Sequence, residues 1–271
     1  MYLDYYGLKE PPFDITPNPR FLFFSPKHRE AFNHLLYGIR ERKGFVQLTG
    51  EVGAGKTTVC RAMLEQLDSH YATALILNPV LGPDQLIAAV ALEFGLPIKG
   101  RDRLEITSAL NQFLLAQIEQ GREAVLIFDE AQDLTDELLE QVRLLSNLET
   151  DERKLLQIVL LGQPELRDRL NDHRLRQLRQ RITVRYHLRP LTRLEVGRYI
   201  QHRLQISGTK GAPYFSAGAL WRIYRYSRGI PRLINAICDK CLLAGYVQQR
   251  DRLDYRLVGL AIRELEGKID L

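Results

Sequence analysis

Cysteine is scarce in this chain of 271 residues. The three cysteines, Cys60, Cys238 and Cys241, are few and odd in number, which is typical of a protein kept in a reducing compartment. Cys238 and Cys241 form a C-x-x-C pattern, but no second pair accompanies them, whereas a zinc site needs four ligands. The pattern lies in an apolar run with helical spacing. We therefore interpret both thiols as core residues, with a metal or redox role as the alternative.

Long hydrophobic runs are missing as well. No window approaches about 18 uncharged apolar residues, so no segment is expected to cross a membrane. The first six residues also lack the basic start and the apolar stretch of a signal peptide. We therefore expect a cytoplasmic chain that reaches the inner membrane only through a partner protein.

Positively charged residues are in small excess over negatively charged ones. The formal net charge of +5 at pH 7 permits nucleic acid or an acidic membrane surface as a partner but requires neither. With 45% hydrophobic residues, a chain of this length can bury a full core and is predicted to divide into two domains.

Residues 50–57 fit G-x-x-x-x-G-K-[ST], the phosphate-binding loop. A β-prone run, 45–49, precedes the loop, and residues 58–67 follow it with apolar residues at helical spacing. In this order of strand, loop and helix, the backbone N–H groups of the loop and the N-terminus of the helix can bind phosphate. The alternative is a glycine-rich turn that binds nothing. The residues expected to bind the nucleotide are Gly50, Glu51, Val52, Gly53, Ala54, Gly55, Lys56, Thr57 and Thr58.

The expected cofactors are ATP and Mg²⁺. Lys56 should reach the β- and γ-phosphates, and Thr57 should give its hydroxyl to Mg²⁺. Residues 124–130 are an apolar run, typical of a strand buried on both faces, that ends in Asp129 and Glu130. Ligands bind at the carboxyl edge of such sheets. We expect Asp129 to hold Mg²⁺, directly or through water, and Glu130 to orient and deprotonate the attacking water. A solvated acidic pair is the alternative.

A further buried run, 156–163, ends in Gln163. At the same edge of the sheet, Gln163 could contact the γ-phosphate or the attacking water. Alternatively, its side chain caps the helix that Pro164 opens.

The rest of the chain alternates strands and helices and then turns helical. Residues 1–27 are rich in proline and aromatics and predict an extended strap. This strap is either structural only, or the region of Phe13 also lines the adenine pocket.

Arginines are dense over 167–203 and indicate a local positive surface. A domain boundary is expected near Leu191. Further strands are predicted at 73–78 and 182–188, and helices at 26–42, 84–94, 103–119, 135–149, 194–207, 216–227, 231–249 and 254–266.

A phosphate loop, an Asp-Glu strand end, a further strand with a polar end and a helical C-terminal part together resemble the AAA+ ATPases. Within that class the chain is similar, over nearly its whole length, to the ExeA/GspA group of secretion ATPases. In its short length the chain most resembles the biogenesis ATPases of the MSHA pilus. Transposition helpers of the TniB type are more distant relatives that share the same core. The segments that carry the similarity are 5–8, 12–13, 17–21, 44–53, 143–150 and 162–166.

The resemblance implies further site residues. Arg181 falls where these proteins carry the arginine finger that reaches a neighbouring subunit's nucleotide, with Arg179 as the fallback. Arg232 matches the sensor 2 arginine of the lid. Asn78 falls where the class often places a residue that restrains the catalytic Glu. Gln163 departs from the Asn or Thr of most AAA+ proteins.

The resemblance also implies the fold and the function. The expected fold is α/β: a P-loop NTPase with a three-layer α/β/α arrangement, a parallel five-stranded sheet and a C-terminal all-helical lid. The expected domains are 1–44 (strap and helix packed on the core), 45–191 (ATPase core) and 192–271 (lid). We expect a ring or helical homo-oligomer that hydrolyses ATP between subunits. It would work with inner-membrane proteins in assembling a type IV (MSHA-like) pilus or a type II secretion-related apparatus. The alternative is a TniB-like DNA-binding transposition helper.

Overall fold

The chain forms two compact units in a computed structural model. The sheet unit consists of Arg29–Gly50 and Val59–Leu188, and the helical unit of Met1–His28, Glu51–Thr58 and Arg189–Leu271. None of the helices in the described part of the chain is long and apolar enough to cross a bilayer. The structure describes residues 1–77, 79, 82–98, 102–148, 154–209 and 211–268.

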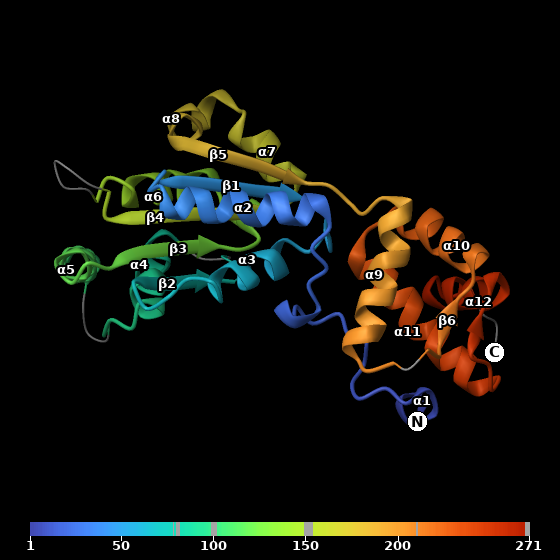
Figure 1. Ribbon diagram of the computed structural model, residues 1–271. Helices are drawn as coiled ribbons and strands as arrows, with labels where there is room; N and C mark the ends of the chain where they lie inside the picture. The colour runs from blue at the N-terminus through green and yellow to red at the C-terminus, as the bar shows by residue number, and fades with distance from the viewer. Residues whose placement is uncertain (78, 80–81, 99–101, 149–153, 210, 269–271) are drawn as a thin grey trace. The chain divides into compact units, whose positions relative to one another are not determined.

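Five parallel strands form the sheet (Figure 1). The five predicted strands are confirmed, with ends that shift by at most two residues. Because neighbouring strands run parallel, the carboxyl ends of β1, β3 and β4 lie at one edge of the sheet. In spatial order the strands are β2 (Tyr71–Ile76), β3 (Glu123–Phe128), β4 (Leu156–Gly162), β1 (Phe45–Gly50) and β5 (Ile182–Leu188).

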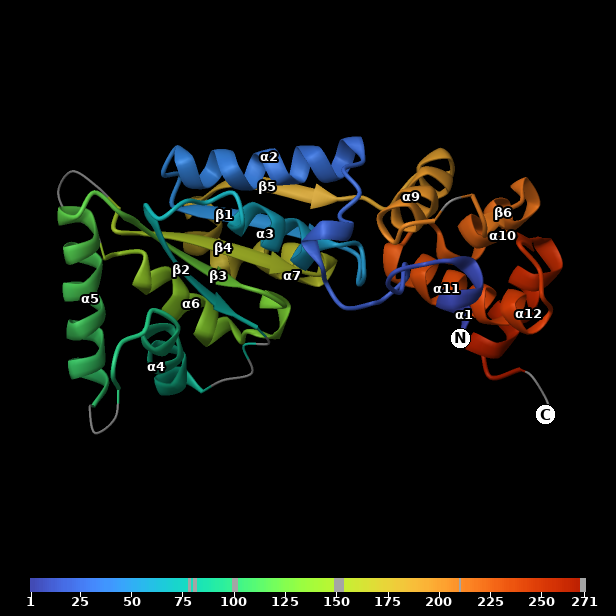
Figure 2. The same ribbon diagram turned by 60° about the horizontal axis from the view of Figure 1, so that its bottom comes forward.

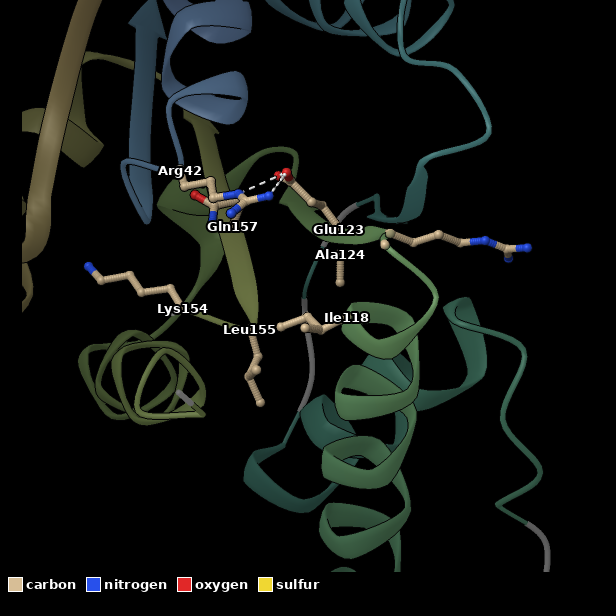
Figure 3. A pocket seen from close by; sticks show the side chains of 9 residues that line it. Arg42, Ile118, Glu123, Ala124, Lys154, Leu155 and Gln157 are labelled. Carbon is tan, nitrogen blue, oxygen red and sulfur yellow. Dashed lines mark hydrogen bonds and ion pairs between the residues drawn. The ribbon is translucent and has the colours of Figure 1, made fainter. Parts of the chain in front are cut away.

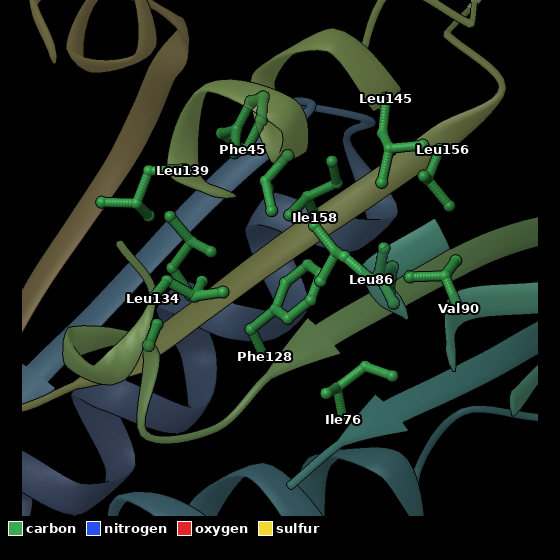
Figure 4. Packing of buried hydrophobic residues seen from close by; sticks show 14 of the residues in the cluster. Phe45, Ile76, Leu86, Val90, Phe128, Leu134, Leu139, Leu145, Leu156 and Ile158 are labelled. Atoms are coloured by element: carbon green, nitrogen blue, oxygen red, sulfur yellow. The ribbon is translucent and has the colours of Figure 1, made fainter. Parts of the chain in front are cut away.

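Both faces of the central strands are buried, which explains why these strands are mostly apolar. On one face Phe128 and Ile158 pack with Leu86 of α4 and Leu139 of α6 (Figure 4). On the other face α2 comes so close to β1 that a Cβ on Gly38 would lie 2.3 Å from a methyl carbon of Val46. The sheet therefore lies between two layers of helices, with α2 and α4 on opposite sides (Figure 2), and the expected α/β/α arrangement is confirmed.

The helices of this part of the chain have the following bounds. They are α2 (Pro26–Arg40), α3 (Lys56–Leu64), α4 (Pro83–Glu93), α5 (Arg103–Glu119), α6 (Asp136–Leu145), α7 (Pro164–Leu170) and α8 (Arg176–Arg181). Among them α8 was not predicted, because a six-residue helix gives too short a pattern to detect.

The helical unit contains the four C-terminal helices predicted from the sequence. It differs from the all-helical expectation in one detail: two-residue strands β6 (Tyr214–Phe215) and β7 (Arg252–Leu253) pair in parallel. Both fall in segments that the sequence marks as breaks, since two residues are too few to show alternation. The helices are α1 (Tyr2–Tyr6), α9 (Arg193–Ile206), α10 (Ala217–Ser227), α11 (Pro231–Val247) and α12 (Tyr255–Leu265).

The N-terminal segment packs with the C-terminal helices, which differs from the expected 1–44 domain packed on the ATPase core. Phe13 is 1% exposed and meets Phe215 edge to face, so its ring is a core side chain of the helical unit. The buried Arg203 guanidinium donates to the carbonyl oxygens of Pro12 and Asp14. These hydrogen bonds connect the extended segment around Pro12 and Asp14 to α9 and satisfy two of its backbone carbonyl oxygens. The boundaries expected at 44 and 191 compare with changes of unit after His28 and after Leu188, and residues 51–58 also group with the helical unit.

All three cysteines are buried, in agreement with their interpretation as core residues. Burial raises the pKa of the Cys60, Cys238 and Cys241 thiols, which keeps them protonated and poorly nucleophilic. We expect no reaction of the native protein with Ellman's reagent at pH 8, and release of three equivalents of chromophore in guanidinium. A thiol that reacts rapidly in the native protein would contradict this expectation.

Candidate functional site

The phosphate loop follows β1 and ends where α3 begins at Lys56. Gly53 and Gly55 have φ angles of 75° and 101°, a region that side chains with a Cβ rarely adopt. Lys56 is buried, and its Nζ donates to the carbonyl oxygen of Glu51 at 3.1 Å, so the ammonium group lies against the loop. The loop thus combines glycine-dependent curvature, a cation and the first N–H groups of a nine-residue helix, which are the elements of an anion cradle.

Arg232 lies at the start of α11 and contacts this loop. Its backbone N–H donates to the carbonyl oxygen of Gly53 at 3.2 Å. A Cβ on Gly53 would come 2.5 Å from the Arg232 Cβ, so only glycine fits there. The resemblance to AAA+ proteins predicted Arg232 as a site residue, and the structure places it beside the phosphate loop within the helical unit.

Asp129 and Glu130 follow β3 directly, at the carboxyl edge of the sheet. Asp129 is 3% exposed; its N–H donates to Ile76 and its Oδ1 accepts the N–H of Glu130, both at 2.9 Å. Glu130 has a φ of 52°, uncommon for a residue with a Cβ. Such outliers concentrate at functional sites, where the surroundings hold them in place.

Two amide side chains hold the Glu130 carboxylate. Its Oε2 accepts from Gln132 Nε2 at 2.9 Å and from Gln163 Nε2 at 3.3 Å. Gln163 is the N-cap residue of α7, but its side chain makes no capping bond, so the capping alternative is not what the structure has. The segments that follow β3 and β4 are thereby joined through side chains at the edge of the sheet where the sequence placed Glu130 and Gln163.

Gln132 is a site residue that sequence reasoning missed. Its Oε1 accepts the backbone N–H of Gln163 at 3.0 Å, so Gln132 bridges the segments after β3 and β4. Its own carbonyl oxygen accepts from Arg169 at 2.8 Å, and Arg169 also pairs with Asp136 at 2.6 Å. The signal that was available is its position two residues after Glu130, in a short turn at the end of a buried strand.

Arg181 is the last residue of α8 and precedes the edge strand β5. Its Nη1 donates to the Ser146 hydroxyl, which in turn donates to the carbonyl oxygen of Arg143 at 2.6 Å. In the described part of the sheet unit, Arg181 makes no hydrogen bond to Asp129, Glu130 or Gln163. Arg179 bonds the carbonyl oxygen of Asn171 at 3.3 Å, and the predicted Asn78 lies outside the described residues.

Both residues expected to hold Mg²⁺ offer oxygen atoms, Thr57 in the helical unit and Asp129 in the sheet unit. Thr57 offers a hydroxyl and the buried Asp129 a carboxylate, both hard oxygen ligands. Among the described residues, no three His, Cys, Asp or Glu side chains are grouped to hold a metal by themselves.

A small pocket at the amino edge of the sheet contains none of these residues (Figure 3). Arg42 donates twice to Glu123 Oε1, at 2.8 and 2.7 Å, and so joins the chain before β1 to the start of β3. Lys154, although it lines the pocket, points away from that pair (Figure 3). Asp129, Glu130 and Gln163, in contrast, follow the carboxyl ends of their strands.

Sequence comparisons identify relatives. A family model described as an AAA domain matches residues 39–170. General secretion pathway protein A of Aeromonas hydrophila is 48% identical over 268 residues, which cover 98% of this chain and 49% of that protein. The chain therefore spans about half the length of this relative.

Solved structures share the fold at low sequence identity. The Aeropyrum pernix ORC2 protein in its ADP form has a TM-score of 0.71 at 17% identity, covering 93% of this chain and 72% of that one. The Thermotoga maritima RuvB Holliday junction branch migration motor has a TM-score of 0.56 at 19% identity, covering 89% and 72%. These likenesses confirm the P-loop NTPase fold alone. The 48% identity over nearly the whole sequence and the AAA domain match show that the chain belongs to the AAA+ family of general secretion pathway protein A.

Proposed function

We propose that the chain binds and hydrolyses ATP in a homo-oligomer, ring or helical, and thereby supports assembly of a type IV (MSHA-like) pilus or a type II secretion-related apparatus. The observation that carries the chemistry is the cluster at the carboxyl edge: a buried Asp129 beside a Glu130 carboxylate held by two amides. The observation that carries the assembly role is the 48% identity to a protein named for general secretion.

In this proposal the loop of residues 50–58 binds the phosphates through its N–H groups. Lys56 offsets charge on the β- and γ-phosphates, as an ammonium group does in other P-loop enzymes. Thr57 and Asp129 would hold Mg²⁺, which when bound draws negative charge from the phosphate oxygens. The Arg232 side chain extends from the segment bonded to Gly53 and would contact the phosphates as the sensor 2 arginine. Asn78 would restrain Glu130 before hydrolysis.

Glu130 acts as the general base. Both hydrogen bonds from the amide side chains end on Oε2 of Glu130. None of the described residues bonds Oε1. The two amides fix the orientation of the carboxylate, while Oε1 accepts a proton from the attacking water. Gln163 orients Glu130 through its Nε2, and its side-chain oxygen would accept a hydrogen bond from the same water.

The position of Arg181 supports an oligomer. It precedes β5, the edge strand, which pairs with β1 on one side only in the described part of the sheet. An arginine there, without a bond to the Glu130 cluster of its own subunit, can serve the nucleotide of a second copy. This arrangement favours hydrolysis between subunits, with the proteins of the inner-membrane assembly apparatus as further partners.

Some of the dense arginines pair with carboxylates of the same chain. Arg169 and Arg174 both pair with Asp136, at 2.6 and 3.1 Å. Arg174 also pairs with Asp172, at 3.2 Å. Ion pairs of this kind reduce the positive field that attracts a phosphate backbone. We therefore prefer intersubunit contact to the transposition-helper alternative for this surface.

Replacing Lys56 by alanine tests nucleotide binding. The loss of a buried cation against the phosphates should weaken binding of a fluorescent ATP analogue with Mg²⁺ by about 100-fold, or about 2.7 kcal/mol. Lys154→Ala is the matched control, because this exposed lysine lies at the amino edge of the sheet. Wild-type affinity in Lys56→Ala would contradict the assignment of the phosphate loop.

The same two variants test the assembly role in the source bacterium. With protein levels matched by immunoblotting, a Lys56→Ala allele should lose surface pili or secreted proteins, and a Lys154→Ala allele should retain them. Normal piliation and secretion in both strains would separate ATP use from assembly and overturn this part of the proposal.

A further inference from the structure

His28 is a buried side chain that no part of the proposed mechanism uses. It lies in the first turn of α2 and is 3% exposed. Its Nδ1 lies 2.8 Å from the Ser25 hydroxyl oxygen, and its Nε2 lies 3.0 Å from the carbonyl oxygen of Ala54 in the phosphate loop. Ser25, His28 and Ala54 all belong to the helical unit, so one side chain connects the end of the N-terminal strap to the loop.

The hydrogen bonds determine the tautomer of His28. A carbonyl oxygen can only accept, so Nε2 carries the hydrogen that reaches Ala54. Nδ1 then accepts from the Ser25 hydroxyl, whose oxygen also accepts the backbone N–H of His28 at 3.3 Å. Burial lowers the pKa of the His28 imidazole, so the ring is neutral at pH 7 and this donor–acceptor order is maintained.

The bond to Ala54 also determines where the next N–H points. In a trans peptide the C=O of one residue and the N–H of the next lie in one plane and point in opposite directions. With the Ala54 carbonyl directed at His28, the Gly55 N–H is directed to the other side of the loop. A Cβ on Gly55 would lie 3.3 Å from His28 Nε2, so the imidazole and the loop are in close contact.

A second carbonyl of the loop is held in the same way. The Gly53 oxygen accepts the backbone N–H of Arg232 at 3.2 Å. Two consecutive loop carbonyls, those of Gly53 and Ala54, are thus bonded to donors outside the loop. Of these donors only the His28 imidazole is a side chain, so it is the one that a substitution can remove without changing the backbone.

We propose that His28 is a positioning residue for the phosphate loop: by holding the Ala54 carbonyl, it orients the Gly55 N–H toward the nucleotide phosphates. This inference rests on the proposed nucleotide binding at the loop and adds to it a residue outside the loop sequence. Ser25 has a supporting part, because its hydroxyl keeps the hydrogen of the imidazole on Nε2.

The test compares His28→Leu with His28→Gln. Leucine fills the buried space but donates nothing, whereas glutamine keeps an N–H donor near the position of Nε2. With a fluorescent ADP analogue, His28→Leu should bind about tenfold more weakly, which is 1.4 kcal/mol, and His28→Gln within about threefold of wild type. His34→Leu, on the exposed side of the same helix, should bind like wild type.

Kinetics and melting separate positioning from a merely structural role. Because the loop contacts phosphates in the ground state and the transition state alike, His28→Leu should raise KM for ATP and leave kcat nearly unchanged. Its melting temperature without nucleotide should stay close to wild type, while the increase caused by ADP becomes smaller. Wild-type affinity and KM in a folded His28→Leu protein overturn the proposal.

Two further outcomes are informative. Should His28→Leu fail to fold, Ser25→Ala tests the same chain of bonds and should weaken ADP binding about threefold, by less than 1 kcal/mol; unchanged affinity in Ser25→Ala then overturns the proposal. Failure of the wild-type protein itself to bind ADP refutes the proposed function, and with it the role of His28. In that case Lys56→Ala and His28→Leu behave like wild type.

Discussion

Glu130→Gln should hydrolyse ATP at least about 100-fold more slowly than the wild-type protein, the usual contribution of a general base. The amide has nearly the same shape as the carboxylate, and its oxygen can still accept from Gln132 and Gln163. It cannot take a proton from water. Binding of ATP should therefore be unchanged, and phosphate release in a single-turnover experiment should measure the loss directly.

Glu137→Gln is the matched control for this substitution. Glu137 lies in the first turn of α6, is exposed, and follows Glu130 by seven residues. The same change of charge there should leave turnover within about twofold of wild type, since surface substitutions have small effects. Equal turnover in Glu130→Gln and wild type would place the base elsewhere. Equal loss in both variants would point to net charge and not to proton transfer.

The carboxyl-edge cluster shows why part of the site was predictable from the sequence. Residues 124–128 are apolar throughout and residues 156–162 are apolar except for Gln157, a pattern typical of strands covered on both faces. Strands of that kind are parallel, and their ends meet at one edge. The polar residues that come directly after them, Asp129 and Gln163, were therefore expected at the same edge of the sheet. The contact from Gln163 to Glu130 agrees with this placement at one edge, although the sequence did not predict the contact itself.

Contacts between residues far apart in the chain, without a periodic pattern, could not be predicted. The burial of Phe13 among the C-terminal helices depends on Arg203, about 190 residues away, whose guanidinium binds the carbonyl oxygens of Pro12 and Asp14. Backbone acceptors are the same at every residue, so no sequence pattern identifies them. The resemblance to AAA+ proteins indicated Arg232 as a site residue, but not that its backbone N–H binds Gly53.

Arg181→Ala should lower ATP hydrolysis by about 1,000-fold and leave ATP binding intact, by the magnitude that arginine fingers have in other NTPases. In the described structure the Arg181 guanidinium is bonded to Ser146 of its own subunit. To act on a neighbour's nucleotide it must exchange that hydroxyl for phosphate oxygens. Arg185→Ala, on the exposed part of the edge strand, is the control and should stay within about threefold of wild type.

Mixing two inactive variants decides whether Arg181 acts on its own nucleotide or on that of a neighbour. Lys56→Ala subunits keep the finger but lose the phosphate loop, and Arg181→Ala subunits keep the loop but lose the finger. If the finger acts between subunits, a mixed oligomer contains interfaces with both parts intact, and hydrolysis should recover to a sizeable fraction of wild type. If Arg181 serves its own subunit, no mixture recovers. Activity in Arg181→Ala alone would remove Arg181 from the mechanism and leave Arg179, which precedes it by two residues on α8, as the arginine to test.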